Sequence, residues 1–217
     1  MANRTLPAYT LHEERANCCT HGIGFFLAIG GLVALSVFAA ARAEMWSTIS
    51  VIVYGITLVL LYATSTSYHA TKNRRIKKVF RLLDHSAIYI FIAGCYTPLM
   101  LVVLHGELGF AMTGLVWSVA IVGVIVTILF MERMKNMAVL LYVAMAGIVM
   151  FVIKPLAIAL PSSGLFLLLG SGLAYGVGLI FYLVDRIPYN HALWHVCVLV
   201  GSVAHFTCVF KHVLLNQ

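Results

Sequence analysis

Three histidines and two other polar residues stand out in a chain that is otherwise strongly apolar. His191 and His195 are four residues apart in "NHALWHVCVLVGSVAHF", and Ser65 and His69 have the same spacing in "STSYH". Residues at i and i+4 share one face of a helix, so two imidazoles one turn apart can bind one metal ion from the same side. A catalytic zinc site takes three protein ligands and a water, and His69, His191 and His195 would supply the three.

Hydrolysis at such a site also needs a base. The metalloprotease motif H-E-x-x-H carries its base between the two histidines, but the corresponding "HALWH" has no carboxylate. The available carboxylate is Asp84, in "RLLDHSAIYIF". Ser65 lies one turn from His69, where its hydroxyl could hydrogen-bond a water or a developing oxyanion. These residues predict a hydrolytic metal site with Asp84 and Ser65 as its catalytic groups.

Composition decides which class of protein must position these residues. Of the 217 residues, 62% are hydrophobic and 10% are charged, whereas a soluble domain carries about 25% charged residues. The formal net charge is +7, but six of the 14 basic residues fall in "KNRRIKKVFR", between two apolar runs. That clustering is typical of a cytoplasmic loop and not of a nucleic-acid-binding groove. The five cysteines are scattered without a C-x-x-C pair, which argues against a disulfide framework.

Apolar runs long enough to span a bilayer fill most of the chain. Seven such runs cover Cys18–Ala41, Met45–Tyr68, Leu82–Leu104, Leu108–Met131, Met137–Leu156, Gly164–Val184 and His191–Leu214. The connections between them are short, so we expect an all-α bundle of seven membrane helices forming a single domain over residues 1–217. The first run is longer than the usual apolar stretch of about 7–15 residues in a signal peptide, and it follows Glu13 and Glu14, so we expect an uncleaved anchor.

The distribution of Lys and Arg sets the expected orientation. Eleven of them fall in the N-terminal tail and the even-numbered loops, and three fall on the other side. The positive-inside rule then predicts a cytoplasmic N-terminus and an external C-terminus. This topology, which was derived without the site residues, brings five of them to one face: Ser65, His69, Asp84, His191 and His195.

The basic segment 72–81 allows two interpretations. Its cations lie between apolar residues that follow a helical spacing, namely Ile76, Val79, Phe80 and Leu83. The segment is either an amphipathic turn or two at the cytoplasmic interface, with anionic lipid headgroups as its partners, or an ordinary positive-inside loop. Both interpretations use the same charges.

The remaining histidines have simpler expected roles. His205 lies deeper in the seventh run, where a hydrogen bond between helices is the more common role. His85, beside Asp84, is expected at the interface or supporting the site, without binding the metal. His105 and His212 fall on the outer side, too far away to join it.

Two further patterns concern support and packing. In "HEERANCCTHGIG", Glu13, Asn17 and His21 recur every four residues, either as an ordinary helix start or as groups that support the metal ligands or contact headgroups. In the sixth run, small residues recur at the same interval: Gly170, Ala174 and Gly178. They predict a close approach of a neighbouring helix.

Several segments, taken in order, resemble the haemolysin III family, the bacterial branch of the progestin and adipoQ receptors. They are "EERANCCTHGIG", "STSYH", "DHSAIYIFIAGCYTP" and "PYNHALWHVCVLVGSVAHF", and the resemblance extends over essentially all seven helices. It implies a seven-helix bundle with a cytoplasmic N-terminus and zinc held by His69, His191 and His195, with Asp84 and Ser65 nearby. The wider superfamily includes alkaline ceramidases, which hydrolyse lipid amides, whereas the family name implies a pore-forming cytolysin.

The leading hypothesis is therefore a multi-pass protein of a bacterial cytoplasmic membrane that hydrolyses a lipid amide or ester with zinc. One alternative is a non-enzymatic membrane sensor in which zinc holds the second, third and seventh helices together. The other is a pore-forming cytolysin. An enzyme needs an exchangeable water on the metal, whereas a structural site is closed by a fourth ligand. A pore needs a continuous polar stripe, and the outer halves of the helices show little polar periodicity.

Overall fold

All of the regular structure that is described is helical. The computed structural model describes residues 9–42, 44–130 and 135–215. The α-helices are α1 (Leu11–Arg42), α2 (Met45–Ala70), α3 (Arg74–Pro98), α4 (Glu107–Phe130), α5 (Lys135–Gly147), α6 (Ile153–Ala159), α7 (Ser162–Leu183) and α8 (Asn190–Cys208). Two π-helical segments, η1 (Leu99–Val103) and η3 (Val209–Leu214), continue α3 and α8, and a 3₁₀ segment, η2 (Ile148–Phe151), joins α5 to α6.

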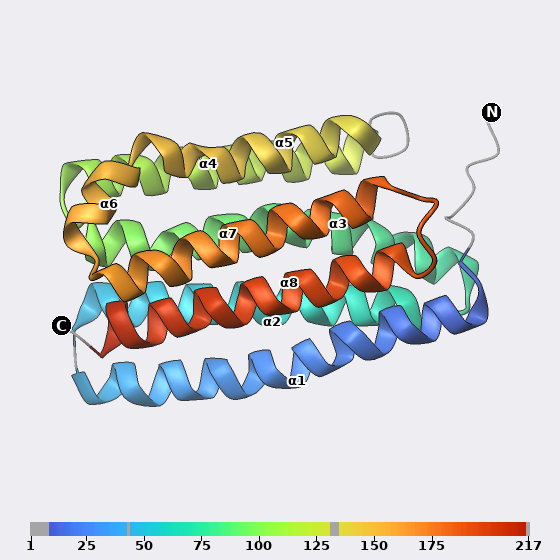
Figure 1. Ribbon diagram of the computed structural model, residues 1–217, viewed down its shortest axis with the longest axis horizontal. Helices are drawn as coiled ribbons and strands as arrows, with labels where there is room; N and C mark the ends of the chain where they lie inside the picture. Colours follow the sequence, from blue (N-terminus) through green and yellow to red (C-terminus); the bar gives the residue numbers. More distant parts are fainter. Residues whose placement is uncertain (1–8, 43, 131–134, 216–217) are drawn as a thin grey trace.

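The helices form an all-α integral membrane bundle. Six of them are long and apolar enough to cross a membrane, and the bent pair of α5 and α6 makes up to a seventh span. The helices run side by side, and α1 begins at the opposite end of the bundle from the end of α8 (Figure 1). The predicted all-α membrane fold is confirmed. The last residue of the fourth predicted run, Met131, lies outside the described residues, as do residues 1–8, 43, 132–134 and 216–217 of the predicted single domain.

The fifth predicted run is not one continuous helix. The axis turns by 56° between its two parts, at Val152, which has φ −118° and ψ 8°. Pro155 explains the break, because its ring would clash with the carbonyl of Phe151 and it has no N–H to donate. Pro155 lies in the first turn of α6, where backbone N–H groups have no partner within the helix, so its missing N–H costs no hydrogen bond.

The first helix begins before the apolar run that predicted it. The backbone N–H of Thr10 donates to Glu13 Oε2 (2.8 Å), and the backbone N–H of Glu13 donates to Thr10 Oγ1 (3.2 Å). This reciprocal pair is a capping box, which satisfies backbone groups that a helix start leaves unpaired. The polar segment 12–17 is therefore helical and continuous with the first span, which the sequence analysis placed from Cys18 onward.

Most of the basic segment is helical, as expected for amphipathic turns and not for an ordinary loop. Asn73 caps α3 by accepting hydrogen bonds from two backbone N–H groups, and residues 74–81 form the first turns of the same helix that enters the membrane. Ile76 and Val79 are about half exposed, at 49% and 56%, whereas Lys77 is buried. The contact of this segment with anionic headgroups stays a prediction.

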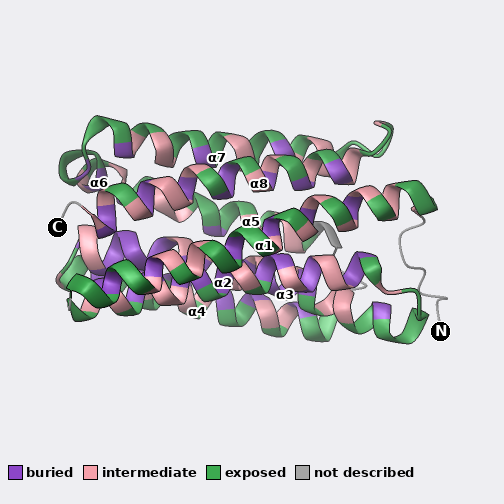
Figure 2. Cartoon of the chain, turned by 90° about the horizontal axis from the view of Figure 1, so that it is seen from below, coloured by how far each residue is buried: buried purple, intermediate pink, exposed green. Residues whose placement is uncertain are grey.

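The core of the bundle lies along α2 and α3. Within their most apolar stretches, 67% of the residues in α3 and its π-helical continuation are buried, against 17% in α7. Figure 2 shows exposed residues over the outer side of α7 and buried ones concentrated in α2 and α3. The exposed side chains include large apolar groups such as Phe166 and Leu173. A surface of this kind suits lipid, which removes any cost of exposing apolar groups to water.

The small residues of α7 act differently from the prediction. Gly178 is buried, and a Cβ there would lie 2.8 Å from side-chain atoms of α8, so close approach at this position is confirmed. Gly170 is exposed and has no atom within 4 Å of a Cβ built on it, so the prediction is wrong there. The buried row of α7 is Gly164, Ser171 and Gly178. These residues recur every seven positions, or about two turns, and so keep one face toward one neighbour.

Candidate metal centre

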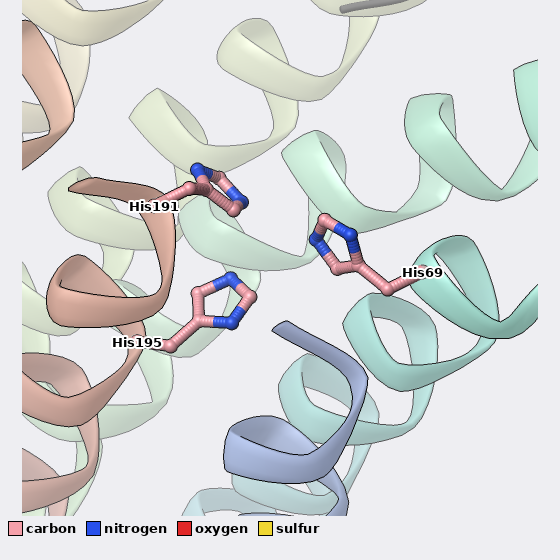
Figure 3. A group of neighbouring side chains, drawn as sticks. All are labelled: His69, His191 and His195. Carbon is pink, nitrogen blue, oxygen red and sulfur yellow. The ribbon is translucent and has the colours of Figure 1, made fainter. Parts of the chain in front are cut away.

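Three histidines from two helices converge at one end of the bundle. His69 lies in the last turn of α2, and His191 and His195 lie in the first two turns of α8. One nitrogen from each ring lies within 4.8 Å of the others, and Figure 3 shows the three rings turned toward a common point. The ring centroids of His69 are 5.1 Å from those of both His191 and His195. The i, i+4 spacing in α8 thus works as the sequence predicts, and the three side chains could hold one metal ion.

Two ring nitrogens of these histidines have no hydrogen-bond partner among the described residues, and a metal ion would serve in its place. His69 Nε2 and His191 Nε2 are buried and have no hydrogen-bond partner among the described residues. Burying a polar group without a partner costs about 1–3 kcal/mol, so two such atoms on neighbouring rings need an explanation. Imidazole nitrogen is a good ligand for zinc and for several other transition metals, and a bound ion would satisfy both atoms at once.

Helix α1 holds two of the three rings from the side away from that point. The Nδ1–H of His69 donates to Glu14 Oε2 at 2.7 Å. His195 Nδ1 lies 3.2 Å from the backbone carbonyl oxygen of Asn17 and 3.2 Å from Thr20 Oγ1. Contacts of this type fix the tautomer and orientation of histidines that bind metals.

Of the two roles expected for this polar segment, both occur, but on different residues. Glu13 caps the helix start, whereas the neighbouring Glu14 contacts the candidate ligand His69. Asn17, which the spacing singled out, contributes its backbone carbonyl, and Thr20, which the spacing did not single out, contributes its hydroxyl. Which groups reach the histidines depends on how α1 is rotated against α2 and α8, and sequence spacing does not determine that rotation.

His21 also belongs to this environment. Its ring stacks on that of His195, with centroids 3.5 Å apart and an angle of 16° between the planes. The ring of Tyr62 is nearly perpendicular to that of His21, with the two centroids 5.0 Å apart. Both nitrogens of His21 are buried without a partner among the described residues. The supporting role suggested by the sequence therefore takes the form of a ring contact.

Asp84 and Ser65 are both buried, Asp84 in α3 and Ser65 in α2. One carboxylate oxygen of Asp84 is 3.6 Å from Nδ1 of His85, and its charge acts on His69, His21 and His191 through space. The Ser65 hydroxyl is buried one turn before His69 and has no partner among the described residues. A carboxylate and an unpaired hydroxyl thus accompany the three histidines.

Tyr9 lies beside two of the three histidines. Its ring centroid is 5.2 Å from that of His191 and 5.9 Å from that of His69. Burial raises the pKa of the Tyr9 phenol well above its usual range, and the nearby Tyr68 and Tyr182 add to this shift. The ring of Tyr9, just before α1, thus contacts two of the three candidate ligands.

The other histidines have the simpler roles expected of them. His205 Nε2–H donates to the backbone carbonyl of Cys95 at 3.2 Å, a hydrogen bond between α8 and α3. His85 binds the carbonyl of Arg81 in its own helix. His105 packs against the rings of Trp46 and Phe110, and His212 lies near Ser163.

The chain resembles known proteins over nearly its whole length. The chain is 42% identical to the hemolysin-3 homolog of Bacillus subtilis (strain 168), over 93% of this chain and 94% of that protein. It is equally similar to hemolysin-3 of Bacillus cereus, over 93% of this chain and 92% of that protein. The human monocyte to macrophage differentiation factor is 29% identical, over 94% of this chain and 85% of that protein. The family described as haemolysin-III related matches residues 9–206, and the chain therefore belongs to this family of multi-pass membrane proteins.

Proposed function

We propose that the protein is a zinc-dependent hydrolase of lipid amides or esters in the cytoplasmic membrane of a bacterium. The observation that carries the proposal is a set of three converging histidine nitrogens, accompanied by the buried carboxylate of Asp84 in α3 and by the buried, unpaired hydroxyl of Ser65 one turn before His69. A purely structural zinc site is closed by four protein ligands. Among the described residues, the group that could hold a metal contains three histidines, which leaves a coordination position for an exchangeable ligand.

Each residue would have a distinct task. His69, His191 and His195 would hold the zinc ion. A bound zinc ion lowers the pKa of a coordinated water to about 7, which supplies a nucleophile at neutral pH. Asp84 would accept the proton of the attacking water and later return it to the leaving group. Ser65 would donate a hydrogen bond to the oxyanion that develops on the substrate carbonyl.

The substrate class follows from the surroundings of the site. His69, His195, Asp84 and Ser65 are buried, and His191 is partly buried, in a bundle whose outer surface is apolar. A membrane lipid could therefore approach from the bilayer, whereas a large soluble substrate would have to cross the polar helix ends. The cations of segment 72–81 would contact anionic headgroups on the same side. With the N-terminus in the cytoplasm, as the charge distribution predicts, the reaction would occur at the inner leaflet.

The experiment is hydrolysis by purified protein in liposomes that contain short-chain ceramide or related lipid amides and esters. Asp84→Asn should keep its metal and lose turnover by about 10²–10⁴-fold, the usual effect of removing a general base. Glu107→Gln is the matched control, because this exposed carboxylate begins α4 at the opposite end of the bundle, and it should leave turnover unchanged.

The outcomes separate the three hypotheses. Wild-type turnover in Asp84→Asn would remove Asp84 from the mechanism. If zinc-loaded wild type hydrolyses none of these lipids, the sensor with a structural metal becomes the better hypothesis. Release of an encapsulated dye from the same liposomes, without any hydrolysis, would favour the pore-forming cytolysin that the names of the Bacillus relatives suggest.

A further inference from the structure

Glu14 connects a candidate metal ligand to a buried cation. One carboxylate oxygen, Oε2, accepts a hydrogen bond from His69 Nδ1 at 2.7 Å. The other, Oε1, accepts one from Lys77 Nζ at 2.8 Å. The ammonium group of Lys77 also lies over the ring of Tyr68, 4.8 Å from its centroid. Residues of α1, α2 and α3 are thus joined through a single carboxylate.

The hydrogen bond determines what the other side of the His69 ring can do. A neutral imidazole carries its proton on one nitrogen, and the other nitrogen is then free to bind a metal. Because a carboxylate accepts from Nδ1, the proton must be there, and Nε2 has the free lone pair. Nε2 is the atom that is buried without a partner among the described residues. The carboxylate also makes the ring a stronger ligand by placing negative charge beside it.

We infer that Glu14 is a positioning residue that fixes the tautomer and orientation of the metal ligand His69, and that Lys77 holds Glu14 in place. The inference rests on the metal binding proposed above but not on hydrolysis. The His69 side chain is fully buried, whereas the side chains of Glu14 and Lys77 are 18% and 11% exposed. A charge pair this sheltered from water is screened less than a surface pair and can hold one geometry.

The chain provides close controls for both residues. Glu13 precedes Glu14, but its carboxylate accepts hydrogen bonds from Thr10 and caps the helix start. Lys78 follows Lys77 but is exposed. Substitutions at Glu13 and Lys78 therefore change the same charges in the same turns of α1 and α3 without touching the chain of contacts that reaches His69.

The test measures zinc affinity of the purified full chain by competition with a chromophoric chelator. Glu14→Gln and Glu14→Leu should weaken binding by about 10–100-fold, the usual cost of losing such a contact, with Leu the worse because it cannot accept a hydrogen bond. Lys77→Met should weaken binding less, since Glu14 would remain. Glu13→Gln and Lys78→Met should bind zinc as wild type does.

A second measurement distinguishes positioning from general stability. In ¹⁵N-histidine NMR spectra recorded well below the thermal midpoint of each variant, the Nδ1–H signal of His69 should be retained in Glu13→Gln and lost in Glu14→Leu. Glu14→Gln keeps the size of the side chain, so it carries the test if the Leu variant does not fold.

Wild-type affinity in both Glu14 variants would overturn the inference. If His191→Ala abolishes binding in the same assay, the metal site itself still stands; if wild type binds no zinc, both proposals fail.

Discussion

The imidazole of His21 stacks face to face on that of His195, at 3.5 Å between ring centroids. The first ring comes from α1 and the second from α8, so the contact ties the start of the chain to one of the candidate metal ligands. Both nitrogens of His21 are buried without partners among the described residues, which leaves two possible roles: a flat surface that orients His195, or an additional ligand.

Substitution of His21 distinguishes these roles. If the ring acts as a surface, His21→Phe should keep zinc binding within about twofold and leave stability equal or higher, because it removes buried polar atoms that lack partners. His21→Ala should lower the free energy of unfolding by about 1–3 kcal/mol through the lost packing. Loss of zinc from the Phe variant, measured by metal analysis, would identify His21 as a ligand.

Metal content gives the most direct prediction for the site. We expect about one zinc ion per chain in the purified protein, and none in the double variant His191→Ala/His195→Ala, because one remaining histidine cannot hold the ion in competition with a chelator. His105→Ala should bind as wild type does, since His105 packs against Trp46 at the other end of the bundle. Retention of stoichiometric zinc in the double variant would refute the assignment.

Packing of α7 on α8 predicts opposite results for two glycines in one helix. Gly178→Ala would place a methyl group 2.8 Å from Cys197 Cβ and from the ring of Trp194, so we expect a loss of about 1–3 kcal/mol of stability. Gly170→Ala meets no atom within 4 Å and should be neutral or stabilise by up to about 1 kcal/mol. Thermal unfolding in a single detergent provides the comparison. Equal destabilisation by both variants would mean that α7 is rotated differently.

Orientation in the membrane is tested with reporters at the C-terminus. The excess of Lys and Arg in the N-terminal tail and even-numbered loops predicts that the C-terminus is external. A C-terminal reporter that works only in the cytoplasm should therefore be silent, and one that works only outside should be active. The reverse result would place the metal site at the outer leaflet and would exclude anionic headgroups of the inner leaflet as partners of segment 72–81.

Much of this protein can be predicted from local patterns in its sequence. Apolar runs of about 20 residues specify spanning helices, because backbone groups in hydrocarbon must be paired within the segment. The i, i+4 spacing places His191 and His195 on one face, and short connections bring the end of α2 and the start of α8 to one side of the membrane. These are properties of single helices and of the number of crossings, so the three candidate ligands could be named without any knowledge of packing.

Other features depend on how each helix is rotated against its neighbours, which no local pattern determines. Glu13 and Glu14 are adjacent and identical in type, yet the first caps α1 and the second contacts His69. Gly170 and Gly178 fit one small-residue pattern, yet only Gly178 meets α8. Adjacent helical residues point about 100° apart, so a modest rotation of α1 or α7 would exchange such roles. That rotation is fixed by the sum of many side-chain contacts between helices, and only the tertiary structure contains it.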